Sequence, residues 1–281
     1  MQTLNPISGW RRHSPAVCGG TSMFLGLWLV VLCLKNTYAT LKTLSLASIS
    51  VMSPQQSVQE IFRTADCVCF DVDSTVIQDE GIDEMARFCG KGEEVKRLTA
   101  EAMGGSMTFQ EALKKRLDII RPTVSQIRQF VATHPVRLTP GVEQLVKSLH
   151  ERGVTVYLVS GGFRCLIEPV AEILGIPLTN IYANRLKFFF NGEYAGFDDT
   201  EPTSRSGGKG LVIRRLKEQH SYQRVIMIGD GATDAEASPP AEGFIGFGGN
   251  VMREEVKKRS SWYVTDFQDL IVALTMQTKT T

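Results

Sequence analysis

Two aspartates, Asp71 and Asp73, directly follow the apolar segment of residues 67–70. Such a segment is typical of a central strand in a parallel sheet, buried on both faces. Carboxylates beside a dry core are costly unless a cation or a reaction employs them. The carboxyl ends of strands are also where open α/β sheets bind their ligands. The pair therefore indicates a metal-dependent enzyme.

Three more polar segments lie farther along the chain: Ser160-Gly161-Gly162, a glycine-rich stretch at 207–210, and the turn 229–234. Taken singly, each has an ordinary explanation as a strand-to-helix turn, a flexible glycine loop or a helix cap. Together they supply hydroxyl and amide donors, a cation and further carboxylates. Because a parallel sheet brings the ends of its strands to one edge, we expect these segments to meet the two aspartates there.

These residue types suit chemistry on a phosphate ester. The ester is anionic, so a carboxylate can approach it only with compensating positive charge. Mg²⁺ binds carboxylates, phosphate oxygens and water, and Asp71, Asp230 and the backbone carbonyl of Asp73 could hold it. Lys209 adds a second positive charge, and Ser160 with neighbouring N–H groups can hold the remaining phosphate oxygens.

The spacing of the aspartates also predicts distinct roles. Asp71 can attack phosphorus and form an aspartyl-phosphate. Asp73, two residues on, projects toward the leaving oxygen, which it can protonate before it deprotonates the hydrolytic water. Asp234 follows Asp230 by four residues, and we expect it to orient the site rather than bind the metal directly.

A helical insertion follows the first strand. Four short helices are predicted, with Thr108 as the N-cap of the third and Pro122 just after its end. Their ranges are residues 81–89, 93–103, 108–120 and 123–133. Short loops between short helices predict an antiparallel bundle.

Beyond residue 140, helices and strands alternate, which predicts an α/β fold with a parallel sheet. Helices are expected at 142–152, 163–174 and 211–219, and strands at 154–159, 224–228, 244–247 and 262–264. Asn191-Gly192 predicts a β-hairpin turn that joins strands at 181–190 and 193–197.

Several motifs resemble a known family. Asp71-Val72-Asp73-Ser74-Thr75 resembles the DxDxT signature of haloacid dehalogenase-like phosphotransferases, and the later motifs match in order. Other segments resemble the phosphoserine phosphatase family more closely. They are residues 80–84, 102–105, 109–116, 184–186, 206–210 and 246–250. The resemblance runs from about Met52 to the C-terminus.

This resemblance implies a haloacid dehalogenase-like, Rossmannoid parallel-sheet core with an inserted four-helix-bundle cap and a small β-hairpin. It implies Mg²⁺-dependent hydrolysis of O-phospho-L-serine in the last step of serine synthesis, by a cytosolic homodimer. Asp71 matches the nucleophile, Asp73 the acid/base, and Asp71, Asp73 and Asp230 the metal positions. The positions that match substrate contacts are Met103, Gly104, Ser160, Gly161, Gly162, Lys209, Thr233 and Arg253.

Substrate selection has its own physical logic, because phosphoserine carries an ammonium and a carboxylate beside its phosphate. Glu80 lies just after the catalytic segment, where it could meet the ammonium. Arg116, at the border of an apolar helix face, could bind the carboxylate as a fork. Without the family resemblance, two solvated helix charges would be the favoured interpretation. Phe109 and Met103 are more often core residues, although they could line a closing lid.

The composition limits the remaining function classes. The chain has 281 residues, is 43% hydrophobic and carries a net charge of +1, so no overall field argues for nucleic acid. Its six cysteines are scattered, which favours reduced thiols and argues against a zinc site.

Residues 1–51 contain four basic and no acidic residues. Their apolar stretch at 23–34 is too short to span a bilayer. We favour a disordered or non-native extension before an internal start at Met52, and a signal peptide or organellar transit sequence is the alternative. The predicted domains are therefore this extension, a catalytic core of residues 52–79 and 135–281, and a cap of residues 80–134.

Three alternatives stay open from the residues alone. One is a related phosphatase for another small phosphomonoester, and another is a non-catalytic regulator that binds phosphate or metal. The third is a membrane-anchored variant, which rests only on residues 23–34. No membrane partner is expected for the catalytic part, which is predicted to be cytoplasmic.

Overall fold

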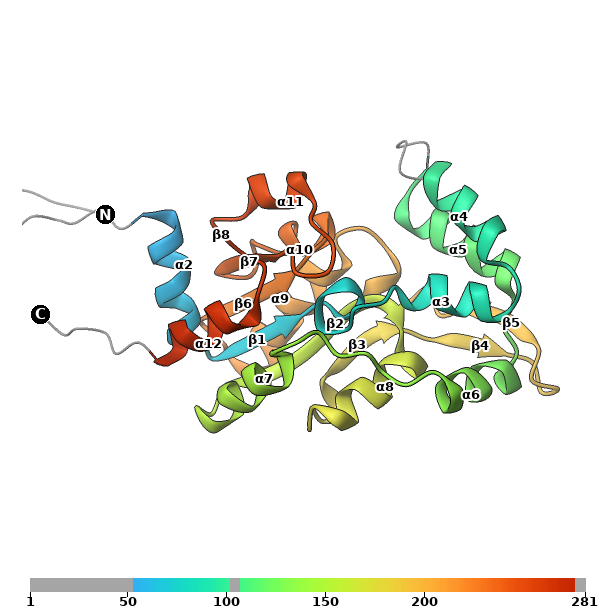
Figure 1. Cartoon of the computed structure of the whole chain (residues 1–281), viewed down its shortest axis with the longest axis horizontal. Helices are drawn as coiled ribbons and strands as arrows, with labels where there is room; N and C mark the ends of the chain where they lie inside the picture. The colour runs from blue at the N-terminus through green and yellow to red at the C-terminus, as the bar shows by residue number, and fades with distance from the viewer. Residues whose placement is uncertain (1–52, 102–106, 276–281) are drawn as a thin grey trace, which may run out of the picture. The chain divides into compact units, whose positions relative to one another are not determined.

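A parallel sheet of six strands, in the order β3-β2-β1-β6-β7-β8, forms the centre of the molecule (Figure 1). The computed structural model describes residues 53–101 and 107–275. The strands are β1 (Cys67–Phe70), β2 (Thr155–Phe163), β3 (Ile181–Asn184), β6 (Val225–Gly229), β7 (Gly243–Phe247) and β8 (Trp262–Val264). The predicted α/β class with a parallel sheet is confirmed.

Strand β1 lies in the interior of the sheet and runs parallel to both of its neighbours. Phe70, its last residue, pairs with Leu158 of β2 and with Ile228 of β6. This register brings the residues that follow Phe70, Leu158 and Ile228 to the same edge of the sheet. Three of the predicted polar segments therefore begin side by side.

Helices cover both faces of the sheet. Side chains of a strand alternate between the two faces, so the apolar strands present buried side chains on each face. Val68 and Phe70 of β1 join one buried cluster, whereas Cys67 and Cys69 join the other. The first face carries α2 (Pro54–Arg63), α7 (Val142–Glu151), α8 (Arg164–Ile173) and α12 (Phe267–Thr275). The second carries α9 (Gly208–His220), α10 (Ala232–Ala235) and α11 (Glu254–Arg259).

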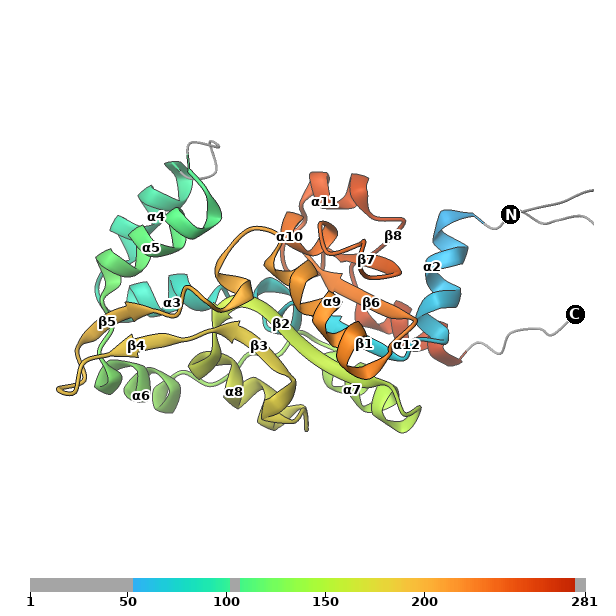
Figure 2. The ribbon, with the colours of Figure 1, turned by 180° about the vertical axis from the view of Figure 1, so that it is seen from behind.

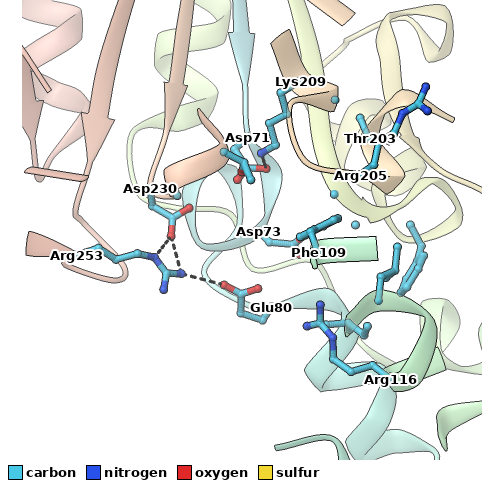
Figure 3. Close-up of a pocket in the computed structure, with 18 residues that line it drawn as sticks. Asp71, Asp73, Glu80, Phe109, Arg116, Thr203, Arg205, Lys209, Asp230 and Arg253 are labelled. Atoms are coloured by element: carbon cyan, nitrogen blue, oxygen red, sulfur yellow. Dashed lines mark hydrogen bonds and ion pairs between the residues drawn. The ribbon is translucent and has the colours of Figure 1, made fainter. Parts of the chain in front are cut away.

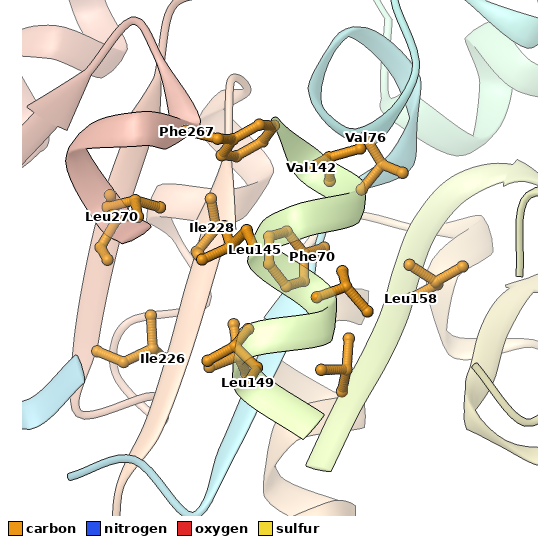
Figure 4. Close-up of a cluster of buried hydrophobic side chains, with 14 of the residues drawn as sticks. Phe70, Val76, Val142, Leu145, Leu149, Leu158, Ile226, Ile228, Phe267 and Leu270 are labelled. Carbon is orange, nitrogen blue, oxygen red and sulfur yellow. The ribbon is translucent and has the colours of Figure 1, made fainter. Parts of the chain in front are cut away.

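The first of these clusters is the larger core. Phe70 packs beneath Leu145 and Leu149 of α7 (Figure 4). Phe267 of α12 stacks on Phe247 of β7, with ring centroids 4.2 Å apart. Seen from behind, α9 crosses the opposite face of the sheet (Figure 2).

The helices predicted between residues 80 and 134 are present as α3 (Gly81–Phe88), α4 (Gly92–Glu101), α5 (Phe109–Ile120) and α6 (Val124–Thr133). They share a buried cluster that includes Met85, Val95 and Ile127. The other face of α5 packs against Phe163 of β2 and against the hairpin. Their designation as a separate cap domain stays a prediction.

The predicted hairpin required a correction. Residues 181–190 do not form one hairpin strand, because β3 (Ile181–Asn184) joins the main sheet beside β2. The hairpin consists of β4 (Leu186–Phe188) and β5 (Tyr194–Phe197). The physical reason is burial: Ile181 and Ala183 belong to the main core, whereas the β4 side chains are only partly buried.

Other boundaries also differ from the prediction. Helix α9 begins at Gly208 rather than at residue 211, so Lys209 lies in its first turn. Helices α2, α11 and α12 were not predicted. Two short 3₁₀ helices, η3 (Leu178–Asn180) and η4 (Pro202–Ser204), flank β3 and the hairpin. None of the helices within the described ranges is both long and apolar enough to cross a bilayer.

Candidate active site

Asp71 is held at the end of β1 by the backbone. Its amide donates a hydrogen bond of 2.9 Å to the carbonyl of Ile228 on β6. The chain then forms a tight turn, η1 (Val72–Val76), which the Ile77 amide closes on the Val72 carbonyl at 3.0 Å. Within this turn Ser74 adopts the left-handed region at φ 54°. That conformation costs a residue with a Cβ about 1 kcal/mol, so the surrounding contacts must hold it.

Lys209 brings positive charge to the nucleophile. Its Nζ lies 2.8 Å from Asp71 Oδ1 and 2.6 Å from Asp234 Oδ1, and the residue is only 6% exposed. Burial alone would lower the pKa of Lys209, but the carboxylates of Asp234 and Asp71 outweigh it and raise that pKa above its usual value. The lysine therefore stays an ammonium at every physiological pH.

Asp230 lies on the other side of Asp71. Its Oδ1 accepts a 3.1 Å hydrogen bond from Thr75 Oγ1, and its Oδ2 lies 2.8 Å from Arg253 Nη2. Burial, and then the charge of Asp71, raise the pKa of Asp230. Such a carboxylate gains from a cation beside it.

Asp71, Asp230 and Asp234 each offer a carboxylate oxygen within 4.8 Å of the others. Hard oxygen donors of this kind suit a cation such as Mg²⁺ or Ca²⁺, so the cluster could bind a metal. Both oxygens of Asp234 are already engaged, one by Lys209 and the other by the Gly231 amide at 2.9 Å. The oxygens of Asp230 have partners too, but Asp71 and Asp230 line a cavity whereas Asp234 is fully buried. We therefore expect Asp71 and Asp230 to hold the ion, as the sequence predicts, and Asp234 to orient Lys209. The Asp73 side chain lies outside this cluster.

Asp73 faces away from the cation cluster, toward the helical insertion. Its Oδ1 accepts a 2.8 Å hydrogen bond from the Gly81 amide, and its Oδ2 lies 3.3 Å from Ser160 Oγ. Burial, followed by the charges of Glu80 and Asp71, raises the pKa of Asp73 to about 7. A carboxyl group with this pKa can give and take a proton near neutral pH.

The Ser160 segment closes the site at the end of β2. Ser160 Oγ accepts a 2.9 Å hydrogen bond from the Gly162 amide. A Cβ at Gly162 would lie 2.6 Å from Asp73 Oδ2, and one at Gly161 would lie 2.9 Å from the Phe109 ring. A side chain at Gly162 would therefore displace the Asp73 carboxylate, and one at Gly161 would displace the Phe109 ring.

These groups surround a cavity of about 210 Å³ (Figure 3). Ten of the predicted site residues line it: Asp71, Asp73, Glu80, Arg116, Gly161, Gly162, Lys209, Asp230, Thr233 and Arg253. Ser160 is fully buried behind this wall. Met103 and Gly104 lie outside the described residues.

Two side chains on the insertion side carry opposite charge into the cavity. Glu80 accepts a 2.8 Å hydrogen bond from Ser74 Oγ and lies 3.5 Å from Arg253 Nη2. Burial raises the pKa of Glu80. Arg116 donates to the carbonyl of Ala112 at 3.3 Å, and within the described part of the chain no carboxylate lies at ion-pair distance from it. Arg116 is thus a cation available to an anionic group in the cavity.

The structure adds residues that the sequence did not single out. Ile82, Leu113 and Phe163 make part of the wall apolar, and Thr203 and Arg205 also line it. Asn184, fully buried at the end of β3, donates a 2.7 Å hydrogen bond to the Gly161 carbonyl. Asn184 belongs to the segment 184–186 that carries the family resemblance, which was a usable signal, but it falls inside the predicted strand 181–190 and its partner lies 23 residues away.

Comparison with known proteins agrees with this geometry. The model of the haloacid dehalogenase-like hydrolase family matches residues 65–241. Phosphoserine phosphatase of Bos taurus is 56% identical over 223 residues, which cover 79% of this chain and 99% of the relative. The human phosphoserine phosphatase is 56% identical over 220 residues, 78% of this chain and 98% of the relative. The chloroplastic phosphoserine phosphatase of Arabidopsis thaliana is 49% identical over 223 residues, 79% of this chain and 76% of the relative.

Solved structures show the same likeness. A phospho-aspartyl intermediate analogue of a phosphoserine phosphatase matches with a TM-score of 0.64 at 27% identity, over 75% of this chain and 99% of that one. A substrate-bound phosphoserine phosphatase complex matches with a TM-score of 0.65 at 26% identity, over the same 75% and 99%. The predicted family and fold are thereby confirmed, and the chain belongs to the phosphoserine phosphatase family of haloacid dehalogenase-like hydrolases.

Proposed function

We propose that the protein hydrolyses O-phospho-L-serine to L-serine and phosphate, as the last step of serine synthesis. The observation that carries this proposal is the placement of Asp71 between the Lys209 ammonium, 2.8 Å away, and the Asp230 carboxylate, with Asp73 at the same cavity. The names of the close relatives support the choice of substrate.

Asp71 is the nucleophile in this proposal. One carboxylate oxygen attacks phosphorus, and the bond from phosphorus to the serine oxygen breaks. Lys209 offsets the negative charge of the incoming phosphate, while Ser160 and the amides of the glycines after it hold phosphate oxygens. Mg²⁺, held by Asp71, Asp230 and the backbone carbonyl of Asp73, would supply further positive charge there.

Asp73 moves the protons. It donates its proton to the leaving serine oxygen as the aspartyl-phosphate forms. The resulting carboxylate then takes a proton from water, whose oxygen attacks phosphorus and releases phosphate from Asp71. The pKa of Asp73, raised to about 7 first by burial, fits both halves of this exchange.

Glu80 and Arg116 select the amino acid. The carboxylate of Glu80 meets the substrate ammonium, and the guanidinium of Arg116 binds the substrate carboxylate. Arg116 lines the cavity, and among the described residues its guanidinium donates only to the Ala112 carbonyl, which supports this role. Met103, Gly104, Thr233 and Arg253 are proposed to complete the contacts.

The wider setting of the enzyme is also a proposal. By family resemblance the protein acts as a cytoplasmic homodimer with Mg²⁺. Residues 1–51 are an extension before the catalytic core, and a targeting role for them is the alternative. One relative is named as chloroplastic.

A substrate panel tests the proposal. Phosphate release is measured from O-phosphoserine, other small phosphomonoesters and para-nitrophenyl phosphate, with Mg²⁺ and with a chelator. Arg116→Met should raise KM for phosphoserine by about 10- to 100-fold, the worth of a lost charged hydrogen bond. The same variant should hydrolyse para-nitrophenyl phosphate, which has no carboxylate, nearly as well as the natural chain.

Two controls sharpen this test. Arg97→Met removes an exposed arginine of α4 that does not line the cavity, and it should leave both substrates unaffected. Asp71→Asn should release no phosphate from any ester. An unchanged KM for phosphoserine in Arg116→Met would favour the second candidate, a phosphatase for another small phosphomonoester.

A further inference from the structure

Asn250 does not line the catalytic cavity, yet it contacts three parts of the chain that build it. We propose that Asn250 is a positioning residue. It fixes the turn η1 relative to the two segments that connect the sheet to the helical insertion, the chain crossings at residues 77–80 and 134–141. The inference rests on the proposed function, because the turn carries the proposed acid Asp73.

Asn250 lies in the loop between β7 and α11, the loop that ends at Arg253. Its Nδ2 group lies 2.7 Å from Thr139 Oγ1, 3.0 Å from the Ser74 carbonyl and 3.3 Å from the Ile77 carbonyl. An amide NH₂ has only two protons, so three acceptors at these distances share them. The Asn250 side chain therefore joins Ser74, Ile77 and Thr139 to one another, and these four residues are called the Asn250 junction.

Thr139 extends the junction. This residue is 5% exposed, and its hydroxyl donates a 2.7 Å hydrogen bond to the Thr75 carbonyl. The hydroxyl proton is thus committed to Thr75, and the oxygen lone pair accepts from Asn250. Thr75 in turn donates to Asp230, one of the proposed metal ligands, at 3.1 Å.

The junction also fixes the strained residue of the turn. Ser74, at φ 54°, uses all of its polar groups: its amide donates to the Asp79 carbonyl at 3.1 Å, its hydroxyl to Glu80 at 2.8 Å, and its carbonyl accepts from Asn250. Asp73 directly precedes Ser74. Relaxation of Ser74 toward an ordinary backbone conformation would therefore move the carboxyl group of Asp73.

Both crossings between the sheet and the helical insertion meet here. Ile77 belongs to the crossing that leads into α3, and Thr139 to the crossing that returns from α6. The two crossings are joined directly by the Gln78 amide, which donates to the Arg137 carbonyl at 3.0 Å. Asn250 ties this pair of crossings to the loop that delivers Arg253 to Asp230 and Glu80. The Asn250 amide thereby links the turn that carries Asp73, the two chain crossings and the loop that carries Arg253.

Asn250→Asp and Asn250→Ala test the inference. The aspartate has nearly the same shape but presents an oxygen to the two backbone carbonyls, so it removes both donors. We expect kcat for O-phosphoserine to fall about 10- to 100-fold, the usual effect of misplacing a reacting group, with KM changed much less. Amide exchange in residues 72–79 should speed up, while exchange in α9 stays as in the natural chain.

Matched variants separate positioning from folding. Thr139→Ser keeps the hydroxyl and should keep kcat, whereas Thr139→Val should lower it, and the double variant with Asn250→Ala should be no slower than Asn250→Ala alone. Asn191→Asp alters an exposed hairpin asparagine that accepts from the Glu193 amide, and it should match the natural chain.

The same kinetics on para-nitrophenyl phosphate separate this inference from the proposed function. If the natural chain hydrolyses the aryl ester but not phosphoserine, the substrate assignment fails and the Asn250 effect is still measured. A kcat within about twofold of the natural value for Asn250→Ala on the aryl ester overturns the inference. If the Asn250 variants do not fold, equal kcat values for Thr139→Val and Thr139→Ser overturn it instead.

Discussion

At the scale of single residues, the site is a set of buried charges that are only partly neutralised. Asp71 and Asp234 share the ammonium of Lys209, and Asp230 has the guanidinium of Arg253. Asp73 has hydrogen-bond donors but no cation in contact with it among the described residues. Among these four aspartates, Asp73 is therefore the one whose ionised form has no cation against it.

Asp73→Asn should stabilise the metal-free protein at high pH. Burial raises the pKa of Asp73 to about 7 in the folded chain from an ordinary value of 3.8. The folded state then binds more protons than the unfolded state between those values, so stability falls as pH rises through this window. Asparagine avoids the buried charge, and its Tm should exceed that of the natural chain at pH 8, by about 2–4 °C for each kcal/mol gained.

Calorimetry with a chelator at pH 5 and pH 8 measures this difference. The advantage of Asp73→Asn should be larger at pH 8. Asp198→Asn is a control whose Tm should fall instead of rise, because hydrogen bonds from Thr200 lower the pKa of this half-buried carboxylate. An equal Tm difference for Asp73→Asn at both pH values would contradict the assignment.

At the scale of elements, α5 forms one wall of the cavity and carries Arg116, the residue proposed to bind the substrate carboxylate. Phe109, Leu113 and Arg116 project from it at helical spacing and line the cavity. A capping box starts the helix: Thr108 accepts from the Glu111 amide at 3.2 Å, and the Glu111 carboxylate accepts from the Thr108 amide at 2.8 Å. The first turn, which holds Phe109, depends on this cap.

Thr108→Ala should lower the free energy of unfolding by about 1 kcal/mol and raise KM for phosphoserine. The first turn of α5 frays without its cap, and Phe109 and Arg116 lose their fixed positions. Thr123→Ala removes the equivalent cap of α6, whose residues do not line the cavity, and should destabilise the protein without changing KM. Equal KM values for the two variants would show that the start of α5 does not position the cavity wall.

Elements of this kind could be predicted to different degrees. Apolar periodicity and the cap at Thr108 predicted α5, and the stop at His134-Pro135 predicted the end of α6. Asn191-Gly192 correctly indicated the hairpin turn. The sequence predicts one strand over 181–190 because no glycine or proline interrupts it, although β3 pairs with β2 and β4 pairs with β5. Only tertiary pairing separates these two strands. Helix α11 has just six residues, too few for a periodic signal.

At the scale of the whole molecule, the matched part of the chain covers nearly all of the bovine and human relatives. The bovine match spans 99% of that protein but 79% of this chain. Residues from Met52 to Thr281 form one compact unit. Ser53 begins it by capping α2, accepting from the Gln56 amide at 3.2 Å.

A chain that starts at Met52 should therefore hydrolyse phosphoserine with the same kcat and KM as the full chain. Helix α2, which packs Val58 and Phe62 into the main core, is retained in it. Phosphate release and the Tm of both chains measure the comparison. A chain from residue 65, which lacks α2, is the control and should melt at a lower temperature. Loss of activity in the Met52 chain would assign the extension a part in the catalytic unit.

The order of motifs along the chain was enough to predict the fold class and the family, because the ends of β1, β2 and β6 carry recognisable polar groups. The junction at Asn250 could not be predicted in this way. Its partners Thr139 and Ser74 lie 111 and 176 residues away, and two of its three acceptors are backbone carbonyls that leave no mark in the sequence. Likewise, the raised pKa of Asp73 depends on burial that only the folded chain creates.

The strand order also bears on when the protein can become active during its synthesis on the ribosome. Strand β1 emerges early, but its neighbour β6 and the groups Lys209, Asp230 and Arg253 come from the last third of the chain. A nascent polypeptide thus exposes Asp71 long before Lys209 and Arg253 have been translated. We therefore expect an unfinished chain to be inert toward phosphate esters until the carboxyl-terminal strands have left the exit tunnel and closed the sheet.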